Sequence, residues 1–138
     1  MGFLSNLFKN NKYKTINGNE LIDLLTNNKN CIIIDVRTAQ EFKSGHIEKA
    51  KNISVSDLRS KINSIIKYKH NDVVLYCASG ARSKSAANFL YKEGFENIYN
   101  LKGGMSSYLN AKENKEDDLI KSSSLFYITK KLLNKKCK

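Results

Sequence analysis

Two continuous apolar runs stand out in the pattern of hydrophobic and polar positions along the chain. Residues 31–36 (CIIIDV) and 72–77 (DVVLYC) lack the alternation that marks a strand exposed on one face. Such runs are typical of strands that are covered on both faces, as in a parallel sheet. Shorter segments at 13–16, 50–54 and 97–101 complete a set of five expected strands.

Helical patterns fill the intervals between these strands. We expect a helix over 17–25 that is capped by Asn17 or Asn19, and a helical turn over 38–42 that is capped by Thr38. Further helices are expected over 56–66, with Ser56 as the cap, over 82–94, with Gly94 at the end, and over 103–109. Strands that alternate with helices predict an α/β domain with a central, mainly parallel sheet and helices on both faces.

The composition changes after Leu109, and this change divides the chain. Residues 1–12 form a short amphipathic segment, residues 13–110 form the α/β domain, and residues 111–138 are expected to be a charged linker and a basic C-terminal helix or tail. The stretch NAKENKEDD (110–118) is typical of a linker. The basic helix either packs on the domain or lies on an acidic membrane or partner surface, and packing or loose attachment is the simpler expectation.

Charge and hydropathy limit the class of protein. The 138 residues have a net charge of +11, which is spread along the chain, so anionic small molecules are favoured and no specific nucleic-acid site is signalled. No apolar run approaches the roughly 18 residues of a transmembrane segment. The N-terminus lacks the order of a signal peptide, and Gly2 matches a myristoylation motif only in part.

Cysteine usage points to a reducing compartment. The chain has three cysteines, Cys31, Cys77 and Cys137, and no Cys-x-x-Cys pair. This odd count argues against a disulfide framework, and with only two histidines a zinc site is not expected either, so we predict a cytoplasmic protein without metal or cofactor. Cys31 is expected to be an inert core residue, and Cys137 an exposed thiol in the tail.

Cys77 ends an apolar run and opens the loop CASGAR, which leads into a helix. A loop of small residues around Gly80 can curl so that its backbone N–H groups point at the Cys77 sulfur. Those donors and the positive end of the following helix favour the thiolate, which is the nucleophilic form of cysteine. The alternative is a buried core cysteine, but packing alone does not account for such a loop. Cys77 is therefore the candidate nucleophile.

Three ordered motifs resemble those of the rhodanese-like sulfurtransferase family. CASGARS (77–83) resembles the family's active-site loop, in which four residues separate the cysteine from an arginine. DVRTAQEFKSGHIEKAKNI (35–53) resembles the upstream signature, and LKGGM (101–105) resembles the closing Gly-Gly turn. The similarity extends from about residue 15 to residue 109 and implies a single-domain, rhodanese-like fold.

The resemblance implies a sulfurtransferase that works through a persulfide. Cys77 would take the sulfane sulfur of thiosulfate, a polysulfide or a persulfide and pass it to cyanide, a thiol or a partner protein's cysteine. Backbone N–H groups of the loop would stabilise the persulfide, and Arg82 would brace the loop or hold anionic donors. The loop residues implied for substrate binding are Ala78, Ser79, Gly80, Ala81, Arg82 and Ser83.

The chain departs from the family pattern at four positions. Ala78 and Ser79 stand where members specialised for thiosulfate often have positively charged side chains, which puts thiosulfate in question as the donor. Lys49 replaces a usual glycine, and Tyr108 stands where tryptophan is frequent. We expect the last two changes to be tolerable changes of surface or packing.

Other polar residues are assigned supporting roles. Asp35 and Cys77 end two expected strands, so both would lie at the carboxyl edge of a parallel sheet. We expect Asp35 to cap the following turn and bond the backbone of its loop, and we expect Arg37 and Glu41, at i and i+4, to pair with each other or to brace that segment. His46 is expected to be a buried residue that bonds the backbone rather than a general base.

Two other functions use similar features. A tyrosine-type or dual-specificity phosphatase also combines a cysteine, a backbone cradle and an arginine, but its loop needs five residues between cysteine and arginine. Here there are four, which gives a tighter ring. A non-catalytic regulatory module would be marked by loss of the cysteine, and Cys77 is present. A sulfur carrier or a persulfide sensor lies between enzyme and module, and the sequence leaves these open.

Overall fold

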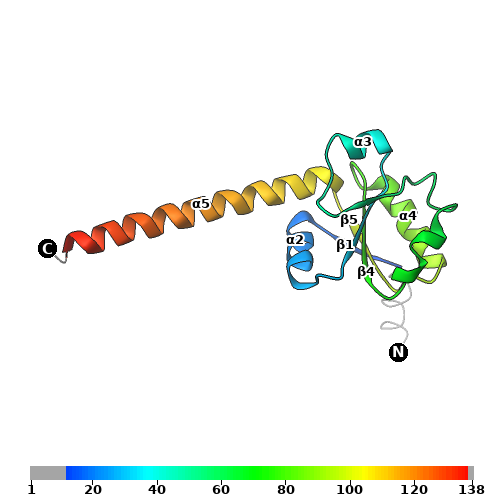
Figure 1. Ribbon diagram of the computed structural model, residues 1–138, viewed down its shortest axis with the longest axis horizontal. Coiled ribbons are helices and arrows are strands. Elements are labelled where there is room, and N and C mark those ends of the chain that lie inside the picture. Colours follow the sequence, from blue (N-terminus) through cyan, green and yellow to red (C-terminus); the bar gives the residue numbers. More distant parts are fainter. Residues whose placement is uncertain (1–11, 137–138) are drawn as a thin grey trace, which may run out of the picture.

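The computed structural model describes residues 12–136 and has a five-stranded sheet at its centre. All strand pairs are parallel, and the order across the sheet is β1-β5-β4-β2-β3 (Figure 1). The strands are β1 (Lys14–Ile16), β2 (Ile32–Asp35), β3 (Lys51–Asn52), β4 (Asp72–Tyr76) and β5 (Asn97–Leu101). This arrangement confirms the α/β class with a parallel sheet. The segment 1–11, with its amphipathic and myristoylation interpretations, and Cys137 lie outside the described residues.

The two apolar runs form β2 and β4, which are neighbours in the sheet. Their side chains alternate between two hydrophobic clusters, one on each face. Ile34 and Leu75 pack on the face that α4 (Ala81–Lys92) covers, whereas Ile33 and Val74 pack on the other face. Both faces are therefore apolar, which explains why the sequence of these strands does not alternate.

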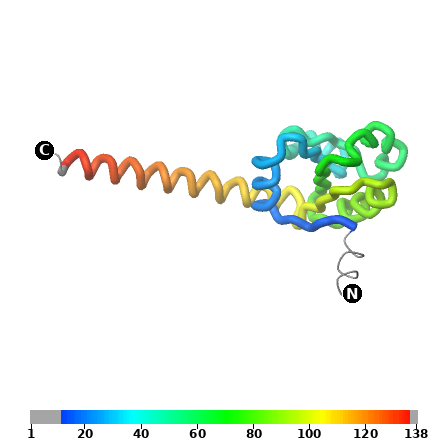
Figure 2. Tube along the Cα trace, turned by 90° about the horizontal axis from the view of Figure 1, so that it is seen from below, coloured from blue at the N-terminus to red at the C-terminus, as the bar shows by residue number. Residues whose placement is uncertain are grey.

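The opposite face is covered by α2 (Gly18–Asn27) and by the start of α5 (Gly104–Lys136) (Figures 1 and 2). The two helices approach so closely that a Cβ on Gly18 would overlap the backbone of Ser107. The Ser107 hydroxyl accepts a hydrogen bond from the Gly18 backbone N–H at 2.9 Å. Because this contact joins α2 to the first turns of α5, it fixes the direction in which α5 leaves the domain.

Two of the three predicted N-caps are confirmed, Asn17 and Thr38, whereas Ser56 caps no helix because none begins directly after it. Asn17 accepts a hydrogen bond from the backbone N–H of Glu20 at 2.9 Å, and Glu20 accepts one in return from the Asn17 N–H. Thr38 and Glu41 form the same reciprocal capping box at the start of α3 (Ala39–Lys43). Each box satisfies N–H groups that the first turn of a helix leaves without partners.

The helix predicted over 56–66 is wrong. The segment consists of turns and two short 3₁₀ helices, Ile62–Ser64 and Ile66–Tyr68. Hydroxyl groups compete for the backbone here, since Ser60 donates to the Asp57 carbonyl at 2.9 Å and Ser64 to the Lys61 carbonyl at 2.6 Å. The apolar residues that predicted the helix still face the core, and Leu58 and Ile65 are 2% exposed.

The linker predicted within 110–118 is also wrong, because α5 runs through it without a break. Ala111 is buried against the domain, and Lys115 donates to the Asp23 carboxylate at 3.0 Å. Beyond this contact the helix projects away from the domain (Figures 1 and 2). Among the helices of residues 12–136, none combines the length and the apolar content needed to cross a bilayer.

Candidate active site

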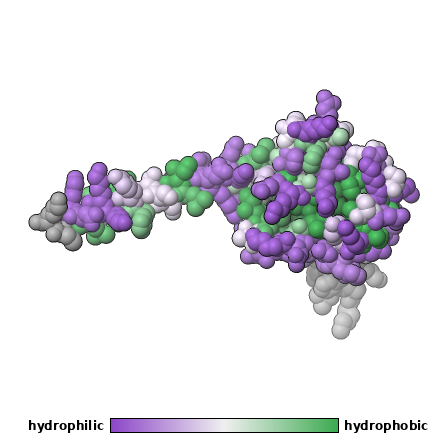
Figure 3. Space-filling model, in the orientation of Figure 1, coloured by the Kyte–Doolittle hydropathy of each residue, from purple (hydrophilic) through white to green (hydrophobic). Residues whose placement is uncertain are grey.

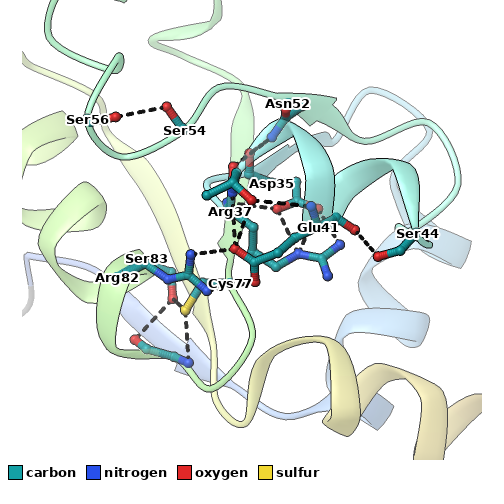
Figure 4. Close-up of polar contacts among 12 residues, drawn as sticks. Asp35, Arg37, Glu41, Ser44, Asn52, Ser54, Ser56, Cys77, Arg82 and Ser83 are labelled. Atoms are coloured by element: carbon teal, nitrogen blue, oxygen red, sulfur yellow. Dashed lines mark hydrogen bonds and ion pairs between the residues drawn. The ribbon is translucent and has the colours of Figure 1, made fainter.

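Cys77 directly follows β4 at the carboxyl edge of the sheet, and it is 1% exposed. The chain then turns through Gly80, whose φ of 109° suits glycine, and enters α4. As predicted, the loop curls inward: the Gly80 backbone N–H donates a hydrogen bond to the Cys77 Sγ at 3.0 Å. The Ser83 hydroxyl lies 3.5 Å from the same sulfur (Figure 4).

These donors set the charge state of the sulfur. Burial alone would raise the pKa of Cys77, because the thiolate loses hydration. This effect of burial is outweighed by hydrogen bonds from the Ser83 hydroxyl and from the backbone N–H groups of Ser83, Gly80 and Ser79. The pKa of Cys77 therefore lies below the ordinary value of 9.0. The loop therefore favours a nucleophilic thiolate in a buried position.

Ser83 has one hydroxyl proton and two acceptors within reach. Its Oγ lies 3.0 Å from the Gly80 carbonyl oxygen and 3.5 Å from the Cys77 Sγ. With a neutral thiol, the S–H group can donate to the Ser83 oxygen while the hydroxyl donates to Gly80. With a thiolate, the hydroxyl turns its proton to the sulfur. Ser83 can thus follow the charge of Cys77 without moving its oxygen.

The loop is also supported from the start of α5. The Met105 backbone N–H donates to the Cys77 carbonyl oxygen at 3.0 Å. Gly104 has a φ of 55°, and a Cβ at this position would overlap the carbonyl oxygens of Cys77 and Ala78. The second glycine of the Gly-Gly turn is therefore required by close backbone contact with the reactive loop.

The Arg82 side chain reaches Glu41 of α3 (Figure 4). Its guanidinium donates to both carboxylate oxygens of Glu41, at 2.8 and 3.0 Å. This pairing and the N-cap bonds to Thr38 lower the pKa of Glu41 to about 2. The expected pair between Arg37 and Glu41 is wrong, because Arg37 precedes α3 and the i,i+4 spacing of a helix does not apply to it.

Asp35 and Arg37 form a buried pair instead, with a shortest N–O distance of 2.7 Å. Asp35 accepts from the Arg37 backbone N–H at 2.9 Å, so the expected bond from Asp35 to its own loop is confirmed. Arg37 also donates to the Gly45 carbonyl oxygen at 2.7 Å, and the Asn52 amide donates to the backbone carbonyls of both Asp35 and Arg37. This network holds the loop between β2 and β3 next to the Cys77 loop.

The other candidate residues lie at different depths. Ala78, Ser79 and Ala81 are exposed and form the rim of the loop, while Gly80 and Ser83 are buried beneath it. His46 is exposed, so the expectation of a buried histidine is wrong. It does lie 2.9 Å from the Phe42 carbonyl oxygen, and its ring stacks on the Phe42 ring.

The structure also tests the expectations for Cys31 and for the two positions, Lys49 and Tyr108, at which the chain departs from the family pattern. Burial, aided by the Asp72 carboxylate, raises the pKa of Cys31 to about 12, which fits the inert thiol that we expected. Lys49 has a φ of 67°, and it is the one non-glycine residue of the 12–136 range with a positive φ. Lysine thus stands at a position where the backbone conformation favours glycine, so the change affects the backbone and not only the surface. Tyr108 packs against the core as expected.

Sequence reasoning missed three parts of the site: the Ser83 hydroxyl bond to sulfur, the Arg82–Glu41 pair and the support from Gly104 and Met105. For the support from Gly104 and Met105, the Gly-Gly doublet in the sequence is a signal that could have indicated a close backbone contact. The pair between residues 41 positions apart leaves no local signal, since Glu41 is already explained by its capping box.

Comparison with known proteins places the chain in a family. The model of the rhodanese-like domain matches residues 18–111. The chain therefore belongs to the rhodanese-like domain family, which is a sulfur-related family of α/β proteins.

Solved structures agree with this fold. A rhodanese-like domain protein from Staphylococcus aureus has a TM-score of 0.63 and 33% identity, and the match covers 69% of this chain and 90% of that one. A human single-domain sulfurtransferase has a TM-score of 0.60 at 24% identity, covering 72% of this chain and 96% of that one, and it supports the fold alone.

Curated relatives have varied names. An uncharacterized protein, YqhL, from Bacillus subtilis is 46% identical over 76 residues, which is 55% of this chain and 59% of that protein. A tRNA uridine(34) hydroxylase from Buchnera aphidicola is 33% identical over 92 residues, covering 64% of this chain, and another is 28% identical over 131 residues, covering 91% of it. The chain spans 30% and 40% of the length of these two relatives.

Proposed function

We propose that the protein is a sulfurtransferase that carries a sulfane sulfur as a persulfide on Cys77. The observation that supports this most directly is the 3.0 Å hydrogen bond from the Gly80 N–H to the Cys77 Sγ. It stabilises negative charge on a buried sulfur, and the same donors are placed to hold an anionic persulfide. Membership of the rhodanese-like family agrees with this chemistry.

The reaction has two displacements. The Cys77 thiolate attacks the outer sulfur of the donor, a new S–S bond forms, and the donor's own S–S bond breaks, so that its electron pair leaves with the remainder of the donor. An acceptor thiolate or cyanide then attacks the outer sulfur of the persulfide. That sulfur passes to the acceptor, and Cys77 is released as a thiolate.

We favour a polysulfide or persulfide over thiosulfate as the donor. Ala78 and Ser79 add no charge at the exposed rim of the loop, and Arg82 is engaged with Glu41. A doubly charged thiosulfate therefore meets less positive charge here than in members with basic residues at these positions. The acceptor is a thiol, cyanide or a cysteine of another protein, and we assign the reaction to the cytoplasm.

Intact-protein mass spectrometry after exposure to inorganic polysulfide tests the proposal. We expect the wild-type protein to gain the mass of one sulfur atom, to lose it on addition of cyanide, and to release thiocyanate. With Cys137 replaced by serine throughout, Cys77→Ser should gain none, while Cys31→Ser should behave like wild type because Cys31 has a raised pKa. An adduct that persists in Cys77→Ser, or no adduct with polysulfide, thiosulfate or glutathione persulfide, would overturn the assignment.

Assays on the same purified protein distinguish two alternative functions, a phosphatase and a carrier or regulatory module. Hydrolysis of p-nitrophenyl phosphate without sulfur loading would indicate a cysteine-dependent phosphatase, which the four-residue spacing from Cys77 to Arg82 disfavours. Loading without repeated turnover to any acceptor would indicate a carrier or regulatory module. The hydroxylase activity in the names of the Buchnera relatives is not transferred, because the chain spans less than half of their length.

A further inference from the structure

The outer half of α5 exposes an unusual set of apolar side chains. Eight large hydrophobic residues between positions 119 and 133 are each at least 52% exposed. They are Leu119, Ile120, Leu125, Phe126, Tyr127, Ile128, Leu132 and Leu133. Figure 3 shows green patches, with white and purple between them, on the part of α5 that projects from the domain. Contiguous exposed apolar surface of this kind marks an interaction site.

Six of these residues share one side of the helix. Leu119, Phe126 and Leu133 recur every seven positions, and Leu125, Ile128 and Leu132 lie beside them, so that at 100° per residue the six fall within about half of the circumference. Lys130, Lys131 and Lys135 lie outside this arc and are exposed, whereas Lys121 falls within it near one edge. The apolar arc is wider than the two-in-seven seam that a partner helix covers.

The charge of this segment has one sign. Residues 119–138 contain six lysines and no aspartate or glutamate. The four acidic residues of the tail all lie just before it, at 113, 116, 117 and 118. Positive charge is therefore separated from negative charge along the helix, and the negative part lies next to the domain.

We infer that the outer half of α5, residues 119–135, lies on the surface of an anionic lipid bilayer. The wide apolar arc would insert between headgroups, and the lysines would reach the phosphates on flexible stems. The acidic stretch at 113–118 would be repelled, so that contact begins after Asp118. The helix lies on the membrane rather than spanning it, in agreement with its limited apolar length.

A second copy of the chain fits this surface less well. Pairing two outer halves would bring eight lysines together, with no acidic side chain in either segment to neutralise them. An acidic protein groove would satisfy the charge, but a groove takes one stripe of a helix rather than half of its circumference. Charge and the width of the apolar arc together favour lipid, independently of the sulfur chemistry at Cys77.

Vesicle flotation of the 138-residue chain tests the inference. We expect it to float with vesicles of phosphatidylglycerol and phosphatidylcholine in equal parts, and to remain in solution with phosphatidylcholine alone. Added salt should release it. Since the chain lacks tryptophan, Phe126→Trp provides a single reporter whose emission should shift to shorter wavelength on binding.

Matched variants separate charge from general effects on folding. Removing Lys130 and Lys131 as K130Q/K131Q should weaken binding by roughly fivefold for each lysine, or about 25-fold together. Leu125→Ser with Leu132→Ser should also reduce flotation. Lys112→Gln, on the same helix but near the domain, should bind like wild type. Circular dichroism and sulfur loading at Cys77 show whether each variant is folded.

Three outcomes would overturn the inference. Equal binding to phosphatidylcholine would remove the charge argument. Failure to float, with a dimer seen by sedimentation, would assign the surface to a second copy. If the protein stays monomeric and does not float, lipid is not the partner of this surface. Capture of an acidic protein through α5 would then assign the surface to a protein partner.

Discussion

Arg82 in α4 and Glu41 in α3 form a two-pronged ion pair, with N–O distances of 2.8 and 3.0 Å, across 41 positions of sequence. The arginine that closes the CASGAR loop is thereby used to tie the start of α4 to the preceding βα unit. Its charge still acts on the Cys77 sulfur, but one N–H donor on each of its two terminal nitrogens is engaged by Glu41. Arg82 is best described as a positioning residue for the loop that contains Cys77.

Glu41→Gln should reduce stability in a pH-dependent way. Glutamine can still form the capping box with Thr38, so the change removes mainly the charge that faces Arg82. We expect a loss of about 0.5–1 kcal/mol at pH 7, because both side chains are about one-third exposed and solvent screens the pair. The folded-state pKa of Glu41, about 2, lies below its ordinary value of 4.5, so the stabilisation is present above pH 4.5 and is lost as pH falls toward 2.

Urea unfolding at several pH values measures this effect. The difference between wild type and Glu41→Gln should shrink steadily between pH 4.5 and pH 2. Glu48→Gln, an exposed change in a neighbouring loop, serves as the control and should be nearly neutral. A difference that stays constant with pH would show that the charge of Glu41 does not contribute to the pair.

Ser83→Ala should move the pH dependence of sulfur loading. The Ser83 hydroxyl helps to lower the pKa of Cys77, so its removal raises that pKa and leaves less thiolate at neutral pH. We expect loading at pH 7 to slow severalfold and the acid limb of the pH–rate profile to shift upward, while the rate at high pH approaches wild type. Ser85→Ala, an exposed serine on the same helix, should change neither. A uniform loss at every pH would indicate a structural role alone.

Lys49→Gly should stabilise the protein. A side chain at φ of 67° costs about 1–2 kcal/mol, whereas glycine's greater freedom in the unfolded chain offsets about 0.4–1 kcal/mol of the gain. The expected net increase in unfolding free energy is about 0.5–1 kcal/mol, measured by urea denaturation. Glu48→Gly, at the adjacent position without a positive φ, should be neutral or destabilising. Equal effects of the two changes would contradict the argument from strain.

Gly104→Ala should damage the Cys77 loop from outside it. The added methyl group would overlap the carbonyl oxygens of Cys77 and Ala78, and overpacking with strain at positive φ should cost about 2–4 kcal/mol. Sulfur loading by the remaining folded protein should also fall. Gly45→Ala has a positive φ but open space around it, so it should cost less and leave loading intact. Equal losses in the two variants would show that backbone strain, not the clash, is responsible.

The sheet could be predicted because its signals are local. The runs at 31–36 and 72–77 are apolar on both faces, and Asn17 and Thr38 each cap the helix that follows. The apolar spacing of segment 56–66 fits an α-helix, but serine hydroxyl groups bond its backbone carbonyls and favour turns and 3₁₀ helices instead. Periodicity identified the buried side of this segment but not its conformation.

Long-range contacts account for the remaining differences. The charge of stretch 110–118 is typical of a linker, but its residues are also compatible with an exposed helix. The packing of Ala111 near Gly18 anchors α5 on the domain, and the helix continues outward from there. Likewise, the CASGAR motif identified Cys77, but the motif alone could not indicate that Arg82 would turn to Glu41. Each of these outcomes depends on a residue far away in the sequence.

The hydrogen bond from Met105 to Cys77 and the close fit of Gly104 have a consequence for protein engineering. The conformation of the hexapeptide CASGAR depends partly on the Gly103–Gly104 pair, which lies more than twenty residues further along the chain. Transplanting the six residues alone into another parallel sheet would move the thiol without its environment. A working graft would need the strand, the hexapeptide and the Gly-Gly turn as one unit.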